Sequence, residues 1–411
     1  MSARRPPRTR GGTLRIAVVG GSLGGLTAAL LLRDLGHDVD VFERATGELT
    51  GFGAGLVAHE TTVRYFIERT SISPDAMTVP VHAYRLLDDK GATLCAEPVH
   101  YRFVSWGTLY RALLGVFGRE RYHQGAALAG FEQDADGVNL RFAAGPPLRY
   151  DLLVLADGVQ STGRRQLFPG VEPAYAGYLA WRGTVDEKDL PAGVRDRLDD
   201  TITYVLMPNS HALVYPIPGA DGRVDRGHRL WNFVWYRNSG PGNFEALMTD
   251  RDGVLHPVSL RPGRMQDQYV KAFRTFASKA LPADVAAVVC GAEQPFLQAI
   301  MDVASPAMAV GRVCIIGDAA FAARPHAAAG TAKAAENAWT LAEAIEKCGN
   351  DLPGALQKWS AHQTALGVSL CRRTRHVGDG SQFRCDWRPG DPGHRFGLYE
   401  PGDSSVWTRR R

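Results

Sequence analysis

The sequence has few cysteines and no long apolar run, and each shortage excludes a class of protein. Its 411 residues include 6 cysteines, none in a Cys-x-x-Cys pair, which excludes a disulfide-rich domain and a zinc site built on such pairs. No apolar run approaches the roughly 18 residues of a membrane-spanning helix. We therefore expect free thiols, no metal, a cytoplasmic location and no stable membrane association.

Charge of one sign is also scarce. The 47 basic and 43 acidic side chains nearly balance and leave a formal net charge of +4. No basic stripe interleaved with aromatic residues is present, so the sequence does not predict nucleic-acid binding. The length is too great for one ordinary hydrophobic core and predicts two domains.

The sequence does contain a strand, turn, helix and strand near its start. Residues 16–19 form a short β-branched run typical of a buried strand, and a glycine-rich turn follows. Residues 27–35 have helical spacing, and a second apolar strand ends on Glu43. In the dinucleotide-binding form of this unit, the helix N-terminus offers free N–H groups and a positive dipole end to a pyrophosphate.

The residues of this turn have separate tasks in the dinucleotide-binding motif. Gly20 makes the tight turn, and Gly25 lets helix and strand pack closely. Ser22 replaces the second glycine and is the smallest change that still lets phosphates approach the backbone. Glu43 stands about twenty residues further on, where an acid accepts from a ribose 2′-hydroxyl and repels a 2′-phosphate, which favours FAD or NAD over NADP. The alternative is a glycine-rich turn of another α/β protein.

Two further motifs follow buried strands later in the chain. DGVQSTGR at 157–164 follows the apolar run 152–155, and GDAAFAARPHAAAG at 317–330 follows the apolar run 313–316. A NAD-dependent dehydrogenase needs the first fingerprint but neither of these motifs. Together the three resemble the FAD motifs of the single-component aromatic hydroxylases, the para-hydroxybenzoate hydroxylase class of flavin monooxygenases.

Within that class the chain is most similar to the 2,6-dihydroxypyridine 3-hydroxylase-like branch. The similarity lies in VVGGS at 18–22, SWGTLYRAL at 105–113, AWRG at 180–183 and the motif from 317 onward. It covers nearly the whole chain up to about residue 375.

The resemblance and the sequence pattern agree on an α/β fold. A Rossmann-type FAD-binding domain is interrupted by a mostly antiparallel β-sheet domain, since 177–289 alternates aromatic and β-branched residues. Helices follow toward the C-terminus. The predicted domains are a discontinuous FAD-binding domain at 1–80, 101–175 and 300–376, a substrate-binding domain at 81–100 and 176–299, and an irregular tail at 377–411.

The resemblance implies non-covalent FAD as cofactor and NADH or NADPH as a transient reductant. Carried over by position, Gly20, Ser22 and Gly25 cradle the pyrophosphate. Glu43 holds the adenosine ribose, and Arg44 lies beside the adenine half. The remaining residues expected to bind FAD are Leu56, Asp157, Asp318 at the ribityl hydroxyls, Pro325 beside the flavin ring, and Gly330, Thr331 and Ala332 at its pyrimidine end.

The helix expected after the motif at 317–330 also affects the flavin electrostatically. If a helix begins near Gly330, its positive end points at the flavin N1 and O2 atoms, where charge collects on reduction. That arrangement stabilises the anionic reduced flavin, which is the form that reacts with oxygen.

The resemblance implies hydroxylation of a small electron-rich aromatic or heteroaromatic ring, with a 2,6-dihydroxypyridine-like compound favoured. Oxygen adds at the flavin C4a atom, and the terminal oxygen of the hydroperoxide attacks the ring. A protein base is needed only to deprotonate a ring hydroxyl. For that role we single out Tyr215, on the expected substrate face, and His326, beside the flavin loop. Beside the substrate and O2, the expected partner is a second copy in a homodimer.

Other functions remain open from the sequence. A tailoring monooxygenase acting on a larger polycyclic or alkaloid substrate would use the same motifs. A flavin halogenase would be expected to carry a W-x-W-x-I stretch and a lysine after the fingerprint, which this sequence lacks. A non-redox binding protein on the same scaffold would have no use for Glu43, Asp157 and Asp318 together.

Overall fold

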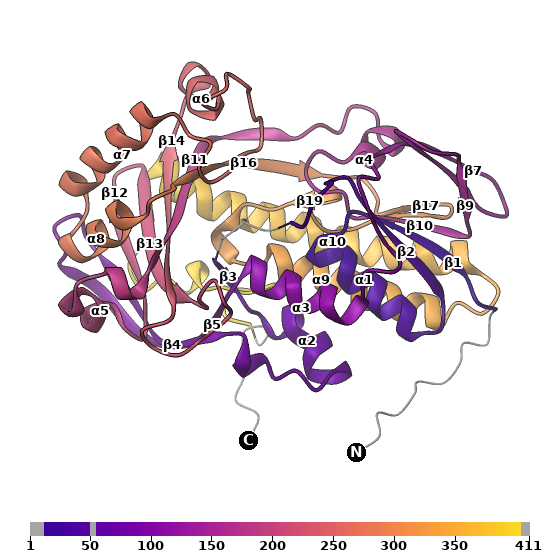
Figure 1. The fold of residues 1–411 in the computed structure, drawn as a ribbon, viewed down its shortest axis with the longest axis horizontal. Helices are drawn as coiled ribbons and strands as arrows, with labels where there is room; N and C mark the ends of the chain where they lie inside the picture. Colours follow the sequence, from indigo (N-terminus) through magenta and orange to yellow (C-terminus); the bar gives the residue numbers. More distant parts are fainter. Residues whose placement is uncertain (1–11, 50–54, 404–411) are drawn as a thin grey trace.

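The computed structural model describes residues 12–49 and 55–403 of the chain. The outermost parts of the predicted domains, at 1–11 and 404–411, lie outside the described residues. Figure 1 shows two sheet-containing regions, with a large twisted sheet on the left and a smaller sheet flanked by helices on the right.

The smaller sheet is the Rossmann-type sheet that the first motif predicts. Its order is β17-β18-β10-β1-β2-β6, parallel throughout except where β17 pairs with β18. The chain passes from β1 through α1 to β2, so the turn at Gly20 lies at the carboxyl edge of a central strand. The elements are β1 (Arg15–Val19), α1 (Leu23–Asp34), β2 (Asp38–Glu43), β6 (Tyr122–Gln124), β10 (Leu152–Leu155), β17 (Ala309–Val310) and β18 (Val313–Ile315).

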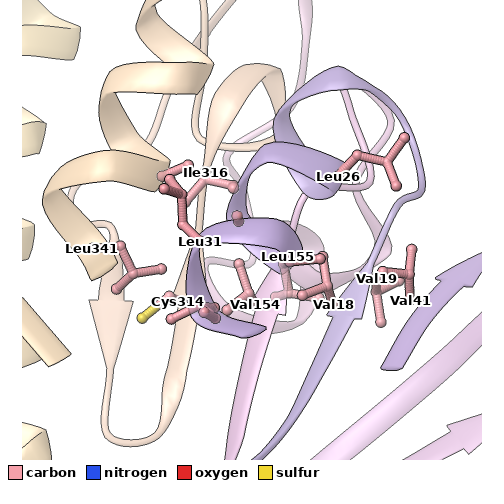
Figure 2. Packing of buried hydrophobic residues seen from close by; sticks show 14 of the residues in the cluster. Val18, Val19, Leu26, Leu31, Val41, Val154, Leu155, Cys314, Ile316 and Leu341 are labelled. Atoms are coloured by element: carbon pink, nitrogen blue, oxygen red, sulfur yellow. The ribbon is translucent and has the colours of Figure 1, made fainter. Parts of the chain in front are cut away.

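This sheet is buried on both faces, which explains its continuous apolar strands. Figure 2 shows Val154 and Cys314 from neighbouring strands packed near Leu31 of α1 and Leu341 of α9 (Gly330–Glu346). The prediction that the first helix begins at residue 27 is wrong, because α1 begins at Leu23. Gly24 and Gly25, taken as part of the turn, lie in the first turn of the helix instead.

The larger sheet has ten strands and is mostly antiparallel. Its order is β15-β16-β11-β14-β13-β12-β4-β5-β3, with β19 paired to β16, and β12 runs parallel to β4. The strands are β3 (Gly55–Val57), β4 (Val79–Leu87), β5 (Thr93–Ser105), β11 (Ala174–Asp186), β12 (Thr201–Met207), β13 (Ser210–Ile217), β14 (Leu230–Asn238), β15 (Ser259–Leu260), β16 (Phe296–Ala304) and β19 (Phe321–Ala322).

Alternation along these strands separates an outer core from an inner face. On β14, Trp231, Phe233 and Trp235 pack in the core that includes Phe273 of α7 (Asp267–Ala280). The alternate residue Tyr236 belongs to a second cluster on the opposite face. Helices α7 and α8 (Ala283–Gly291) cover the outer face at the left of Figure 1. The inner face therefore carries the tyrosines.

The remaining elements connect and cover these sheets. They are α2 (Glu60–Arg69), α3 (Trp106–Phe117), α4 (Thr162–Leu167), α5 (Ala192–Leu198), α6 (Pro241–Met248) and α10 (Leu352–Asp379), with a small sheet of β7 (Leu128–Gln133), β8 (Val138–Phe142) and β9 (Leu148–Tyr150). In the predicted tail, α10 continues to Asp379 and then a π-helical turn, η5 (Gly380–Arg384), leads into a segment that buries Phe396 and Leu398. The exact domain boundaries stay a prediction.

Across the two described stretches of chain, no helix combines the length and the apolar composition that a bilayer crossing requires.

Candidate active site

A cavity of about 740 Å³ lies where the two sheets meet. Residues from the first motif and from the loops after β10 and β18 line one part of it, and the inner face of the larger sheet lines another. Among the residues predicted from sequence, those that line the cavity are Gly20, Ser22, Glu43, Arg44, Leu56, Asp157, Tyr215, Asp318, Pro325, His326, Gly330 and Thr331. Gly25 and Ala332 are buried beside this set.

The glycines of the first motif are required by close backbone contacts. Gly20 has a φ of +108°, and a Cβ there would lie 2.2 Å from the Ala156 carbonyl oxygen. A Cβ on Gly25 would lie 1.8 Å from the Gly20 carbonyl oxygen. Ser22 is the N-cap residue of α1, yet its side chain makes no capping hydrogen bond. The cavity-lining N-terminus of α1 therefore keeps its backbone donors for a ligand.

Glu43 is fixed by backbone donors at the end of β2. Gly21 N donates to Oε2 at 2.9 Å, and Ala45 N donates to Oε1 at 2.9 Å. Each oxygen keeps further acceptor capacity, so the carboxylate can still receive hydroxyl groups. Arg44 beside it is exposed, and Leu56 lies on β3, paired with Val104 of β5.

Asp157 presents an acceptor that no described residue satisfies. Its Oδ2 accepts from Thr162 N at 2.8 Å and from Gly163 N at 3.3 Å, whereas the buried Oδ1 has no hydrogen-bond partner. Burial raises the pKa of this carboxyl group. A buried acceptor without a partner is costly in a native fold, which indicates that a ligand donor belongs there.

Asp318 is held by a buried lysine that the sequence analysis missed. Lys333 Nζ donates to Asp318 Oδ1 at 3.0 Å and also to the Phe321 carbonyl oxygen. Lys333 is 1% exposed, whereas the Asp318 side chain is 51% exposed. The only sequence signal was a lone lysine in the alanine-rich run GTAKAAENA.

The second helix N-terminus also reaches the cavity. Helix α9 begins at Gly330, as expected, and no side chain caps it. Pro325, Gly330 and Thr331 line the cavity next to it. Two uncapped helix N-termini, a glycine cradle and an unpartnered acidic oxygen fit an elongated dinucleotide that carries a flavin. By contrast, the described residues contain no cluster of three or more His, Cys, Asp or Glu that could hold a metal ion.

Tyr215 lies on the inner sheet face, but its hydroxyl is already used. It donates to the Gly55 carbonyl oxygen at 2.9 Å, and Arg182 donates to the same oxygen at 3.1 Å. Burial raises the pKa of Tyr215 to about 12. A phenol that stays protonated and donates its hydrogen bond to a carbonyl oxygen does not suit the predicted role of base.

His326 belongs to a cluster of buried rings. Its Nε2 lies 2.7 Å from the Tyr178 hydroxyl, and its ring centre is 5.3 Å from that of His211. Burial and the nearby Arg324 charge lower the pKa of His326 to about 3, so the ring is neutral at ordinary pH. Sequence analysis missed His211, although it stands four residues before Tyr215 on the same strand, where alternation puts both on one face.

The C-terminal segment forms part of the cavity wall, which the sequence analysis did not foresee. Trp387, His394 and Phe396 line the cavity. Trp387 and His394 stack with ring centres 4.6 Å apart, and Gly397 N donates to the Ala327 carbonyl oxygen at 3.2 Å. Because this segment has no hydrophobic period, its sequence gave no signal of packing.

Two family models match the chain. The NAD(P)-binding Rossmann-like domain matches residues 18–68, which hold the first motif. The FAD binding domain-like model matches residues 175–302, within the larger sheet.

Characterised relatives match almost the full length. The chain is 38% identical over 398 residues to 2,6-dihydroxypyridine 3-monooxygenase of Paenarthrobacter nicotinovorans, which covers 96% of this chain and 98% of the relative. It is 27% identical to salicylate hydroxylase of Pseudomonas putida, over 87% of this chain and 83% of that one.

A solved structure agrees with this match. The 2,6-dihydroxypyridine-3-hydroxylase from Arthrobacter nicotinovorans superposes with a TM-score of 0.90 at 36% identity, covering 95% of this chain and 98% of the other. A Klebsiella pneumoniae protein solved with FAD and uric acid shares the fold, with a TM-score of 0.71 at 23% identity over 90% of this chain and 89% of that one. With a cavity that fits a flavin dinucleotide beside an aromatic pocket, the chain belongs to the FAD-dependent aromatic hydroxylases, monooxygenases that use NAD(P)H and O2.

Proposed function

We propose that this enzyme hydroxylates a small dihydroxypyridine-type ring. The observation that carries the proposal is one continuous cavity, with flavin-compatible groups at one part and buried tyrosines and histidines at the other. The relative with 38% identity over 96% of the chain is named for 2,6-dihydroxypyridine, which supports this substrate class. The C-terminal segment adds Trp387, His394 and Phe396 to the wall of the cavity, which leaves less room for a larger polycyclic substrate.

The cofactor residues in this proposal keep the roles expected from their positions. Bound FAD, once reduced by NAD(P)H, supplies the chemistry that activates O2 for transfer to the ring. The N-terminus of α1, with Gly20 and Ser22, holds the pyrophosphate, and Glu43 accepts from the ribose. Asp157 and Asp318 offer acceptors along the cofactor, and the N-terminus of α9 donates at the flavin. Overall, one oxygen atom enters the ring C–H bond, and the other leaves as water.

The substrate residues hold the ring and exclude water. Tyr215 and Arg182 fix the Gly55 backbone, while Trp387 and Phe396 cover the pocket from the C-terminal segment. With Tyr215 protonated and His326 neutral with a low pKa, we propose that no side-chain base removes a proton from the ring. In this proposal the dihydroxypyridine enters the pocket already deprotonated at one hydroxyl.

The proposal also covers location and assembly. All six cysteines are unpaired thiols, which supports a cytoplasmic location. A homodimer is the proposed assembly, and sedimentation of the FAD-loaded protein tests it.

The test is NADH and NADPH oxidation by the FAD-loaded protein with 2,6-dihydroxypyridine, salicylate or uric acid. We expect strong stimulation by 2,6-dihydroxypyridine and formation of a trihydroxypyridine. Stimulation by salicylate or uric acid instead would contradict the proposed substrate class.

A further inference from the structure

Two buried histidines in the substrate pocket each have one ring nitrogen held by the protein. His211 is 1% exposed and His326 is 7% exposed, and both line the cavity. Which nitrogen carries the proton decides what each ring offers to a ligand. The neighbouring groups fix that choice in both cases.

The neighbours of His326 direct its other ring nitrogen away from helix α10. A Cβ on Gly378 of α10 would lie 2.8 Å from both Cδ2 and Nε2 of His326, so this bond of the ring lies against the helix. Nδ1 is the ring atom opposite that bond and points away from α10. No described residue forms a hydrogen bond with Nδ1.

Tyr178 determines the tautomer of His326. Burial raises the pKa of Tyr178, so the phenol stays protonated. Among the described residues, His326 Nε2 is the one acceptor within hydrogen-bond distance of its hydroxyl. The hydroxyl therefore donates to Nε2 at 2.7 Å, and the ring proton of His326 resides on Nδ1. Arg324 lies 5.6 Å from the tyrosine ring centre and is paired with Asp302 at 2.9 Å and Asp379 at 2.6 Å, which fixes the arrangement.

His211 has the opposite tautomer, and it too is left with one ring N–H as a donor. Gln382 Nε2 donates to its Nδ1 at 3.3 Å and to Ser381 Oγ at 3.1 Å. Ser381 Oγ lies 2.5 Å from Nδ1 and, because it accepts from Gln382, its hydroxyl proton is directed at the histidine. Nδ1 is thus an acceptor, and the ring proton of His211 resides on Nε2.

The charges around the cavity favour a negative ligand at this pair. The acidic residues that line the cavity in the described chain are Glu43, Asp157 and Asp318, all among the residues assigned to the cofactor. Arg182 lines the substrate part, with its guanidinium held by Gln298 at 2.9 Å and by Gly55. The pocket therefore combines a fixed cation with two neutral N–H donors.

We infer that His326 Nδ1–H and His211 Nε2–H together bind an anionic oxygen of the substrate ring. This inference rests on the proposed function and makes both histidines hydrogen-bond donors, with Tyr178 and Gln382 as positioning residues. A donor pair selects a ring that enters already deprotonated, and it rejects a ring that carries amino groups in place of oxygens.

The test compares amide substitutions that keep or lose each donor. The side-chain amide of asparagine overlays Nδ1 of histidine, and that of glutamine overlays Nε2. His326→Asn and His211→Gln therefore keep the donors, whereas His326→Gln and His211→Asn lose them. Binding of 2,6-dihydroxypyridine and of 2,6-diaminopyridine is measured by calorimetry on oxidised FAD-loaded protein without NAD(P)H, at about pH 8, where ordinary histidines are neutral.

We expect the wild-type protein to bind 2,6-dihydroxypyridine at least about tenfold more tightly than the diamine. Each donor-losing variant should bind 2,6-dihydroxypyridine about tenfold or more weakly than its donor-keeping counterpart. Tyr178→Phe should bind this compound several-fold more weakly than the wild type, while the flavin absorbance bands persist. Equal binding by the two members of each pair would overturn the inference, whereas a wild-type protein that binds neither compound would contradict the proposed function itself.

Discussion

At the scale of single residues, the cofactor part of the site is held in place by the protein's own hydrogen bonds. Glu43 is held by two backbone N–H groups, so its carboxylate has one orientation toward the cavity. This residue and Gly20 were predictable, because their spacing follows from the geometry of the motif. The hydrogen-bond partners of His211 and Lys333 were not, since Gln382 and Asp318 stand elsewhere in the chain.

Replacing Glu43 by Gln should lower FAD affinity. The amide places an NH2 group against a backbone N–H donor and removes the charge that accepts from the ribose. Because a hydrogen bond to a charged group contributes about 1.5–3 kcal/mol, the Kd for FAD should rise about tenfold or more. Titration of apoprotein with FAD, followed by flavin fluorescence, measures this.

Glu48→Gln is the matched control, because Glu48 is an exposed carboxylate paired with Arg119 on the surface. Its Kd for FAD should stay within about twofold of the wild type, as expected for a surface pair. If the Glu43 and Glu48 variants bound FAD equally well, Glu43 would have no part in cofactor binding.

At the scale of elements, the N-terminus of α9 and the loop before it act as one unit. Lys333, in the first turn of α9, ties the helix to Asp318 and to the Phe321 carbonyl oxygen. The sequence predicted the helix start at Gly330 because the glycine and the alanine-rich run are local signals. The start of α1 was predicted four residues late, because Gly24 and Gly25 were taken for turn residues although they lie inside the helix.

Replacing Lys333 by Met should destabilise the fold. Methionine fills a similar volume but leaves the buried Phe321 carbonyl oxygen without its donor and Asp318 without its partner. We expect the free energy of unfolding to fall by about 1–3 kcal/mol, measured by urea denaturation.

The comparison variant is Lys347→Met, at the other end of the same helix, where the lysine is 75% exposed. Its pairing with Glu343 is on the surface, so the change should stay below about 0.5 kcal/mol. Similar losses in both variants would show that Lys333 acts only as an ordinary helical lysine.

At the scale of the whole molecule, the substrate pocket depends on segments from the entire chain. His211 comes from β13, His326 from the loop before α9, and Trp387 from the C-terminal segment. The sequence predicted the interrupted Rossmann-type fold because strands and motifs are local patterns. It did not predict the part that the C-terminal segment plays in the pocket, because the segment after α10 has no hydrophobic period and is held by contacts such as the hydrogen bond from Gly397 N to the Ala327 carbonyl oxygen, which are distant in sequence.

The buried histidines should make folding stability depend on pH. Burial lowers the pKa of His326 to about 3 and that of His211 well below its ordinary value of 6.5. Below about pH 6.5 the unfolded chain binds protons that the folded chain does not, so stability falls as pH falls toward 3. The titratable and charged groups that face these rings are Arg324, Tyr178, Tyr204, Tyr236 and His394, beside Ser381, Gln382 and Trp387. Among the described residues, no carboxylate forms an ion pair with either ring.

The double variant His211→Gln with His326→Asn isolates this effect. Between about pH 5 and 6.5, before most carboxylates titrate, the wild type should lose up to about 1.4 kcal/mol of unfolding free energy per pH unit for each histidine. The double variant lacks both histidines, so its unfolding free energy should fall less steeply by that amount. Buried His37 still contributes to the fall in both proteins, with the same sign. If urea denaturation gave both proteins the same change of unfolding free energy with pH across this range, the assignment of neutral histidines would be contradicted.

The central claim is that this flavin enzyme inserts one atom of O2 into a dihydroxypyridine ring. The most direct measurement is turnover of 2,6-dihydroxypyridine under isotopically heavy O2 with NADH or NADPH, followed by mass spectrometry of the product. We expect a trihydroxypyridine that carries one heavy oxygen atom, formed in proportion to the reductant consumed. Reductant consumption that yields only hydrogen peroxide, with the pyridine recovered unchanged, would contradict it.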